Sequence, residues 1–184
     1  IISMCHTLYG ILRINGEAVS FENGIGYIES DRGTSFPKSY IWTQCSIPKE
    51  QPSSIVAAVA DIPLGPIHIN GCICCIYHRG KQYRLSTYSG AKVVRCTENE
   101  LVLVQGRYFF EVSLLKENPL PLKAPQKGAM ARMIHESAAY KVQYRFYERG
   151  KKVFDYTSKQ AAFEFVPGCM PVYDKKQAIK AALS

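Results

Sequence analysis

An alternation of apolar and polar residues with a period of two is the feature that most limits what this chain can fold into. The clearest case is Tyr140–Tyr147, where apolar side chains share one face and polar ones the other: Tyr140, Val142, Tyr144 and Phe146 against Lys141, Gln143 and Arg145. Successive side chains of a strand point to opposite sides, so the pattern predicts a strand with one buried face. Arg149–Gly150 then turns the chain before Val153–Tyr156 returns.

Three further turns join strand-like segments in the same way. Asn15–Gly16 lies between Leu8–Ile14 and Val19–Phe21, Arg79–Gly80 between Cys72–Tyr77 and Tyr83–Tyr88, and Gln105–Gly106 between Leu101–Val104 and Tyr108–Leu115. Short turns between many strands, without alternating helices, indicate an antiparallel all-β domain. A sheet this long must close or stack to bury its edges. We therefore predict an antiparallel β-barrel.

Three other segments complete the predicted organisation. Ile55–Ala60 is apolar on both faces, which predicts a strand covered on both sides. Pro119–Pro125 holds three prolines, each without a backbone donor, so we expect irregular chain there. The tail Asp174–Leu183 has apolar residues at helical spacing after a candidate N-cap, which predicts a short C-terminal helix.

Length and composition narrow the function classes. The 184 residues fit a single domain over 1–184, or one half of a two-barrel protein, and the start on Ile1 leads us to expect a natural start further upstream. No apolar run approaches the roughly 18 to 20 residues of a membrane-spanning helix, so we expect no integral membrane segment. The net charge of +8 is dispersed along the chain rather than gathered, which argues against a nucleic-acid partner.

The cysteines point to a reducing compartment. Seven is an odd number, so complete disulfide pairing within the chain is impossible, and buried reduced thiols in a cytoplasmic protein are the simpler interpretation. Cys72 and Cys75 form a C-x-x-C pair, but strand alternation would send them to opposite faces. We therefore expect no metal. Gly24-x-Gly26 lacks the third glycine and the following helix of a phosphate-binding loop, so we expect no cofactor either.

The segment Gly26–Cys45 is unusually rich in acids and aromatic rings. If Tyr27–Asp31 and Tyr40–Gln44 are strands, alternation places these side chains on one face of each: Tyr27, Glu29 and Asp31, and Tyr40, Trp42 and Gln44. Gly33 and Phe36–Pro37 would form the connecting turn. If both faces look inward, two carboxylates, a glutamine and three rings meet in an otherwise apolar interior.

Acids beside electron-rich rings have a chemical use. An apolar pocket disfavours the charged form of a carboxyl, so Glu29 or Asp31 would stay protonated and act as a general acid. The Trp42 ring would stabilise a developing cation by roughly 0.5 to 2 kcal/mol. Together they would protonate an alkene and steer the carbocation. The same residues are compatible with ion pairs from the acids to Arg32 or Lys38, and with Trp42 as ordinary core.

The run GYIESDRGTSFPKSYIWTQC, residues 26–45, resembles the hallmark of tocopherol-cyclase-like proteins, approximately G-Y-I-E-K-D-W-G-x-S-F-P-x-x-W-I-W-x-Q. Upstream, the region from His6 to Phe21 resembles the G-x-L-x-I-N-G-x-x-x-x-F hairpin of the same family. Looser similarity continues downstream in these segments: Ile55–Pro63, Lys81–Tyr83, Tyr88–Ala91, Leu122–Pro125 and Gly128–Glu136. The resemblance therefore covers most of the chain.

This resemblance implies a lipocalin-like barrel, commonly one of two side by side, of which this chain is the C-terminal one. In plant members the activity is cyclisation of a prenylated quinol to a chromanol, without a redox cofactor. Carried over by position, the motif makes Glu29 and Asp31 the catalytic candidates and supplies a substrate-binding wall: Tyr27, Phe36, Tyr40, Trp42 and Gln44. Arg32 and Tyr40 replace tryptophans of the pattern, and Ser46 replaces an asparagine; these departures concern the chemistry more than the fold.

Arg132 completes the set of substrate-binding candidates. It either forms a helical pair with Glu136, four residues on, or reaches the site to pair with Asp31. Two functions follow from these residues. The first is an intramolecular cyclase or isomerase acting on a prenylated or polyene substrate, and the second is a carrier that holds a hydrophobic small molecule without chemistry. A weaker third is a structural remnant whose interior is packed shut.

Overall fold

A computed structural model of the chain describes residues 1–48, 52–116 and 120–168. The dominant element is a ten-stranded antiparallel sheet in the order β8-β7-β6-β5-β14-β13-β11-β10-β9, with β12 paired to β13. Its strands are β5 (Tyr40–Ile47), β6 (Ser53–Leu64), β7 (Ile67–His78), β8 (Lys81–Ser86), β9 (Lys92–Thr97), β10 (Glu100–Gln105), β11 (Tyr108–Lys116), β12 (Leu120–Gln126), β13 (Ala129–Glu148) and β14 (Lys151–Val166). The helical content of the described residues is one 3-10 turn, Thr87–Ser89.

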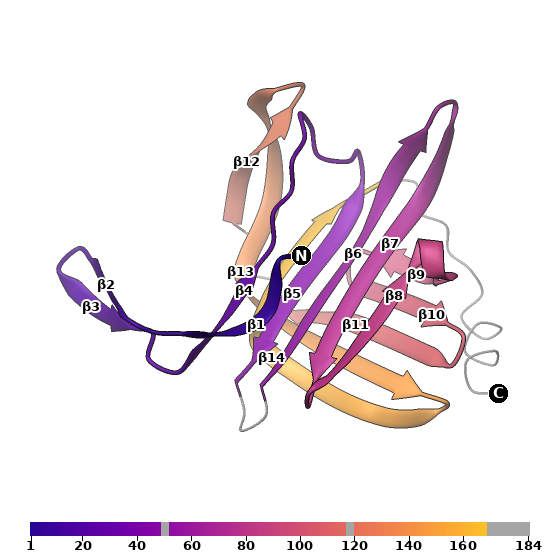
Figure 1. Ribbon diagram of the computed structural model, residues 1–184. Helices are drawn as coiled ribbons and strands as arrows, with labels where there is room; N and C mark the ends of the chain where they lie inside the picture. The colour runs from indigo at the N-terminus through magenta and orange to yellow at the C-terminus, as the bar shows by residue number, and fades with distance from the viewer. Residues whose placement is uncertain (49–51, 117–119, 169–184) are drawn as a thin grey trace.

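The sheet curls until its two ends approach one another (Figure 1). A side chain bridges this seam: the Gln105 amide oxygen on β10 accepts a hydrogen bond from the Ser86 backbone N–H at 2.9 Å. The Gln105 amide nitrogen donates to the Arg84 backbone carbonyl at 3.4 Å. One amide side chain of β10 thus satisfies two backbone groups of β8, the end strand that has no ladder partner on this side. The predicted antiparallel β-barrel is confirmed.

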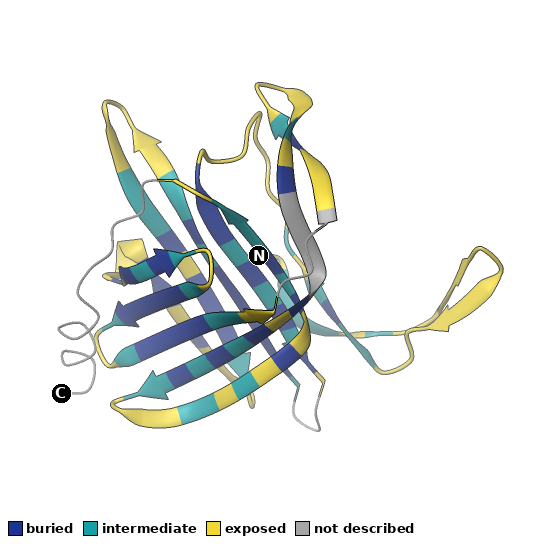
Figure 2. Cartoon of the chain, turned by 180° about the vertical axis from the view of Figure 1, so that it is seen from behind, coloured by how far each residue is buried: buried dark blue, intermediate teal, exposed yellow. Residues whose placement is uncertain are grey.

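The core lies on the concave face of the curled sheet. Alternate residues of each strand point inward and interlock, and Figure 2 shows the resulting bands of buried positions. The bulkiest of these fully buried side chains are Tyr144, Phe110, Phe146, Phe163 and Ile41. The buried Tyr144 hydroxyl shares a 2.6 Å hydrogen bond with Thr43 Oγ1, which also donates to the Ala162 carbonyl at 2.9 Å. The interior therefore holds a polar pair that is fully satisfied.

A second layer lies outside the barrel. Strand β1 (Ser3–Leu8) pairs with β4 (Gly24–Ile28), and the pair contacts the convex face of the main sheet at β6 and β5. At Gly26 the paired strand comes close: a Cβ at this position would overlap the His6 ring, which would have to move. Between them β2 (Ile11–Ile14) and β3 (Glu17–Ser20) form a hairpin that projects away from the barrel (Figure 1).

All four predicted hairpins are confirmed. In three of the turns the first residue and the glycine both take positive φ, for example 50° at Asn15 and 89° at Gly16. In the fourth, β10 runs through Gln105, and Gly106 alone of the pair takes positive φ, 51°. The β6 segment Ile55–Ala60 is covered on both sides as expected, by the core on one face and by β1 on the other.

The expectation of an irregular Pro119–Pro125 segment is wrong for its described part. Leu120–Gln126 is the strand β12, which pairs with β13. Because β12 has a partner on only one side, a proline nitrogen can face away from the ladder, and the register shifts between Ala124 and Gln126, next to Pro125. The predicted helix at Asp174–Leu183 lies outside the described residues. No helix among the described residues has the length and apolarity to cross a membrane.

Candidate functional site

Strand β5 has two unlike faces. Ile41, Thr43 and Cys45 point into the core, whereas Tyr40, Trp42 and Gln44 alternate with them and occupy the convex side. We expected the latter face to look into the barrel interior, and the structure places it on the opposite side. The segment from β4 to the β5 start lies over this convex face, so Trp42 and Gln44 are half-buried there.

Glu29 is the centre of a small polar cluster on this face. Its Oε2 accepts a hydrogen bond of 2.6 Å from the Tyr27 hydroxyl and one of 3.1 Å from Trp42 Nε1. Burial, followed by the hydrogen bond to Glu29, raises the pKa of Tyr27 above its ordinary value. Tyr27 therefore stays protonated at neutral pH and remains a donor to the carboxylate. The structure thus brings together three of the predicted residues: Tyr27, Glu29 and Trp42.

Asp31 is not part of this cluster. Strand β4 ends at Ile28, and the chain from residue 29 to residue 39 is irregular, so alternation does not extend to Asp31, which is exposed. Within the described part of the chain, no ion pair links Glu29 or Asp31 to an arginine or lysine. Arg32 is likewise exposed. The acid that the fold holds in a defined environment is therefore Glu29.

The remaining wall residues lie on the same face with other partners. The buried Tyr40 ring meets the Phe36 ring edge-on, with centroids 5.9 Å apart, and the Tyr40 hydroxyl donates to Glu164 Oε2 at 3.0 Å. Gln44 Nε2 donates to Ser46 Oγ at 3.0 Å. Glu164 on β14 is directly opposite Trp42 in the ladder and is the residue that sequence reasoning missed. Its signal was an acid alternating with Phe163 and Phe165.

Arg132 acts on the loop that precedes β5. It lies on a strand, β13, so the helical pair with Glu136 is wrong. Its guanidinium donates to the Pro37 carbonyl at 2.7 Å and to the Lys38 carbonyl at 2.8 Å, rather than to Asp31. Ser35 Oγ accepts from the Lys127 backbone N–H at 2.8 Å. The β12–β13 hairpin therefore holds the loop that delivers Phe36 and Tyr40 to the site.

The described cysteines do not gather at one site. Cys72 and Cys74 belong to the inner core, while Cys75 is buried on the convex side, so the C-x-x-C pair points to opposite faces as the alternation predicted. Within the described residues, no group of three or more histidine, cysteine, aspartate or glutamate side chains is placed to hold a metal ion.

Comparison with known proteins gives the family. The sequence model of the tocopherol cyclase-like family matches residues 1–166. The chain belongs to that family. A probable chloroplastic tocopherol cyclase from Oryza sativa subsp. japonica is 23% identical over 177 residues, which cover 84% of this chain and 36% of the rice protein. The chain thus spans about a third of the length of this curated family member. No solved structure matches the present chain.

Proposed function

We propose that this tocopherol cyclase-like chain contributes to binding a prenylated quinol, or a similar hydrophobic small molecule, and to its acid-catalysed cyclisation. The observation that carries the proposal is the environment of Glu29. Tyr27 and Trp42 donate hydrogen bonds to one of its carboxyl oxygens. Both donors are neutral, so neither forms an ion pair with the carboxylate. Its other oxygen, Oε1, has no hydrogen bond to any described residue.

The proposed reaction uses Glu29 for both proton transfers. An apolar substrate seated on this face would exclude water from Glu29, and the transferable proton is placed on Oε1. Oε1 then gives its proton to the prenyl alkene, and a tertiary carbocation forms. The quinol oxygen attacks that carbon and closes the ring, and the phenolic proton passes to the carboxylate. One C–H and one C–O bond form while the alkene π bond and the O–H bond break, so the substrate is isomerised without a change in oxidation state.

The surrounding residues supply orientation and charge stabilisation. Trp42 presents an electron-rich ring beside the acid, which stabilises a developing cation by roughly 0.5 to 2 kcal/mol. Phe36 and Tyr40 extend the aromatic wall, and Gln44 supplies an amide donor one alternation further along β5. Asp31 is the second acid candidate, at the exposed edge of the site. Arg132 serves as a positioning residue through the loop it holds.

The cysteines bear on the compartment in which the protein works. The six described cysteines are unpaired, which supports a reducing, cytoplasmic compartment. We also infer that the chain forms one barrel of a two-barrel protein, with the rest of the substrate site supplied by the partner barrel.

The test is turnover of a geranylgeranyl hydroquinone, with the chromanol product measured by mass spectrometry. Glu29→Gln removes the transferable proton at nearly constant shape, and we expect a loss of about 100- to 10,000-fold. Glu17→Gln, an exposed carboxylate on β3, is the matched control and should keep wild-type turnover.

Two outcomes would overturn parts of the proposal. If Asp31→Asn abolishes turnover while Glu29→Gln does not, the assignment of the acid is wrong. If the folded protein binds the quinol tightly but forms no chromanol, the chain is a hydrophobic carrier rather than part of a cyclase.

A further inference from the structure

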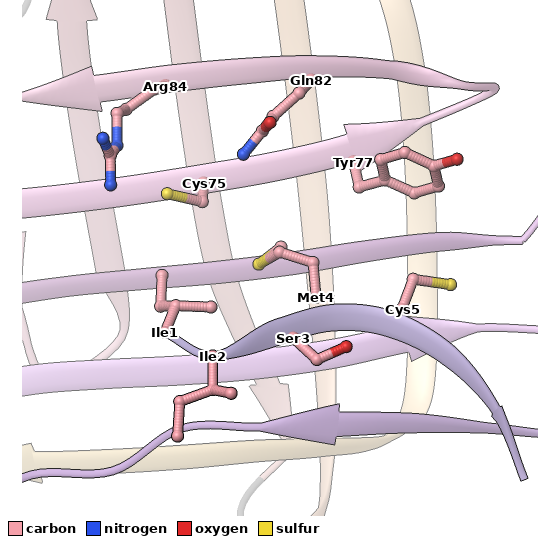
Figure 3. Close-up of a pocket in the computed structure, with 9 residues that line it drawn as sticks. All are labelled: Ile1, Ile2, Ser3, Met4, Cys5, Cys75, Tyr77, Gln82 and Arg84. Atoms are coloured by element: carbon pink, nitrogen blue, oxygen red, sulfur yellow. The ribbon is translucent and has the colours of Figure 1, made fainter.

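A hollow lies on the convex face, between β1 and the β7–β8 hairpin, and its lining does not include Glu29. It is a cavity of about 420 Å³ between β1, β7 and β8 (Figure 3). Ligand cavities in proteins span about 300 to 1,000 Å³, so this volume is sufficient for a small molecule or for part of a longer one. Its lining residues are Ile1, Ile2, Ser3, Met4, Cys5, Cys75, Tyr77, Gln82 and Arg84.

The β7–β8 side of the cavity is polar and positively charged. Arg84 and Gln82 extend from β8 toward β7 in Figure 3. Arg84 is the one charged side chain in the lining, and no acidic side chain is among these described residues. The guanidinium interacts with the Cys75 thiol, which forms the floor and is only 2% exposed. No ion pair of the described residues involves Arg84. Its charge therefore remains available to an anion.

The β1 side of the cavity is apolar. Met4 on β1 and Ile1, just before β1, extend toward the same space, whereas the Ile2 side chain points the other way (Figure 3). A hydrophobic chain seated against Ile1 and Met4 would remove apolar surface from water. The cavity thus has the Arg84 guanidinium, which forms no ion pair with a described residue, at one wall and an apolar wall opposite.

We propose that this cavity binds the head and upper chain of an anionic single-chain amphiphile, with Arg84 and Gln82 on the anion and β1 on the hydrocarbon. The backbone register places Gln44, Val56, Cys75 and Arg84 in one row across β5 to β8. The proposed site therefore shares a face with the Glu29 cluster but uses different side chains. It does not rest on the cyclisation chemistry, and a protein with no cyclase activity would still show it.

Calorimetric titration with dodecanoate, dodecyl phosphate and dodecanol, each below its micelle concentration, tests the site. We expect both anions to bind one site and dodecanol to bind roughly 10- to 100-fold more weakly, because it cannot form the charge-assisted bonds. The tighter of the two anions identifies the source, a free carboxylate or a lipid phosphate.

Two variants make the test specific. Arg84→Gln should weaken both anions roughly 10- to 100-fold and leave dodecanol unchanged. Arg13→Gln removes the same charge from the exposed β2 strand and should change nothing. The proposal is overturned if dodecanol binds as tightly as the anions, if Arg84→Gln binds them like the wild type, or if Arg13→Gln weakens them equally. Circular dichroism of both variants confirms that they are folded.

Discussion

The two faces of β5 are built from adjacent residues and have different surroundings. Ile41 and Thr43 face the core of the curled sheet, where the Thr43 hydroxyl bonds Tyr144. Trp42, between them, faces β4 and donates a hydrogen bond to Glu29. The inner face is covered by the barrel itself, whereas the described cover of the outer face is the thin β1–β4 layer and the loop that holds Phe36.

With the proposed site on the outer face, this difference would separate stability from function within one strand. Packing in the closed core has no room to relax, so changes there are expected to cost folding free energy. The outer layer is narrow and leaves its side chains half-buried, so changes there should act on ligands more than on the fold. A site on the convex face can therefore vary without endangering the barrel.

The largest effect on stability is expected from the inner face. Ile41→Ala removes a fully buried side chain and should lower the free energy of unfolding by about 2 to 5 kcal/mol. Urea unfolding followed by circular dichroism measures this loss. A loss below about 1 kcal/mol would show that the concave face is not a tightly packed core.

A medium effect is expected from the polar pair inside the core. Thr43→Val keeps the shape but leaves the buried Tyr144 hydroxyl without its 2.6 Å partner, at a cost of about 1 to 3 kcal/mol. The double variant Thr43→Val, Tyr144→Phe should recover part of that cost, since both polar groups are then gone. If the double variant is as unstable as the sum of the two single ones, the hydrogen bond is not what joins them.

The smallest effect is expected one residue further along. Gln44→Ala on the outer face loses only a hydrogen bond to Ser46 and should change the free energy of unfolding by about 0.5 kcal/mol or less. The same urea titration applies, with Ile41→Ala as its inner-face counterpart. A cost comparable to that of Ile41→Ala would remove the distinction between the faces.

Much of the barrel could be predicted from local patterns. Asn15–Gly16 and Arg149–Gly150 fix hairpins through positive φ at both turn residues, and alternation over Tyr140–Tyr147 fixes which side chains share a face. Alternation does not say which face is inside. On β5 both faces carry large or polar residues, so the choice depends on how the whole sheet curls and on which face β4 covers.

The errors have similar causes. The prolines near Leu122 predict irregular chain, yet β12 is an edge strand, in which a proline nitrogen can face away from the neighbouring strand and needs no hydrogen bond. Asp31 was placed with Glu29 on the assumption that the strand continues, but β4 ends at Ile28. Glu164 went unnoticed because its position opposite Trp42 depends on long-range pairing between β14 and β5, which no local pattern reveals.

Fluorescence of Trp42 tests the central claim most directly, since it is the single tryptophan of the chain and lies against Glu29. The account predicts that titration with a geranylgeranyl hydroquinone, excited where tyrosine does not absorb, changes the Trp42 emission in a saturable way. The change should track the binding isotherm measured by calorimetry. Binding that leaves the Trp42 emission unchanged, or no saturable binding at all, would contradict a ligand site on the outer face of β5.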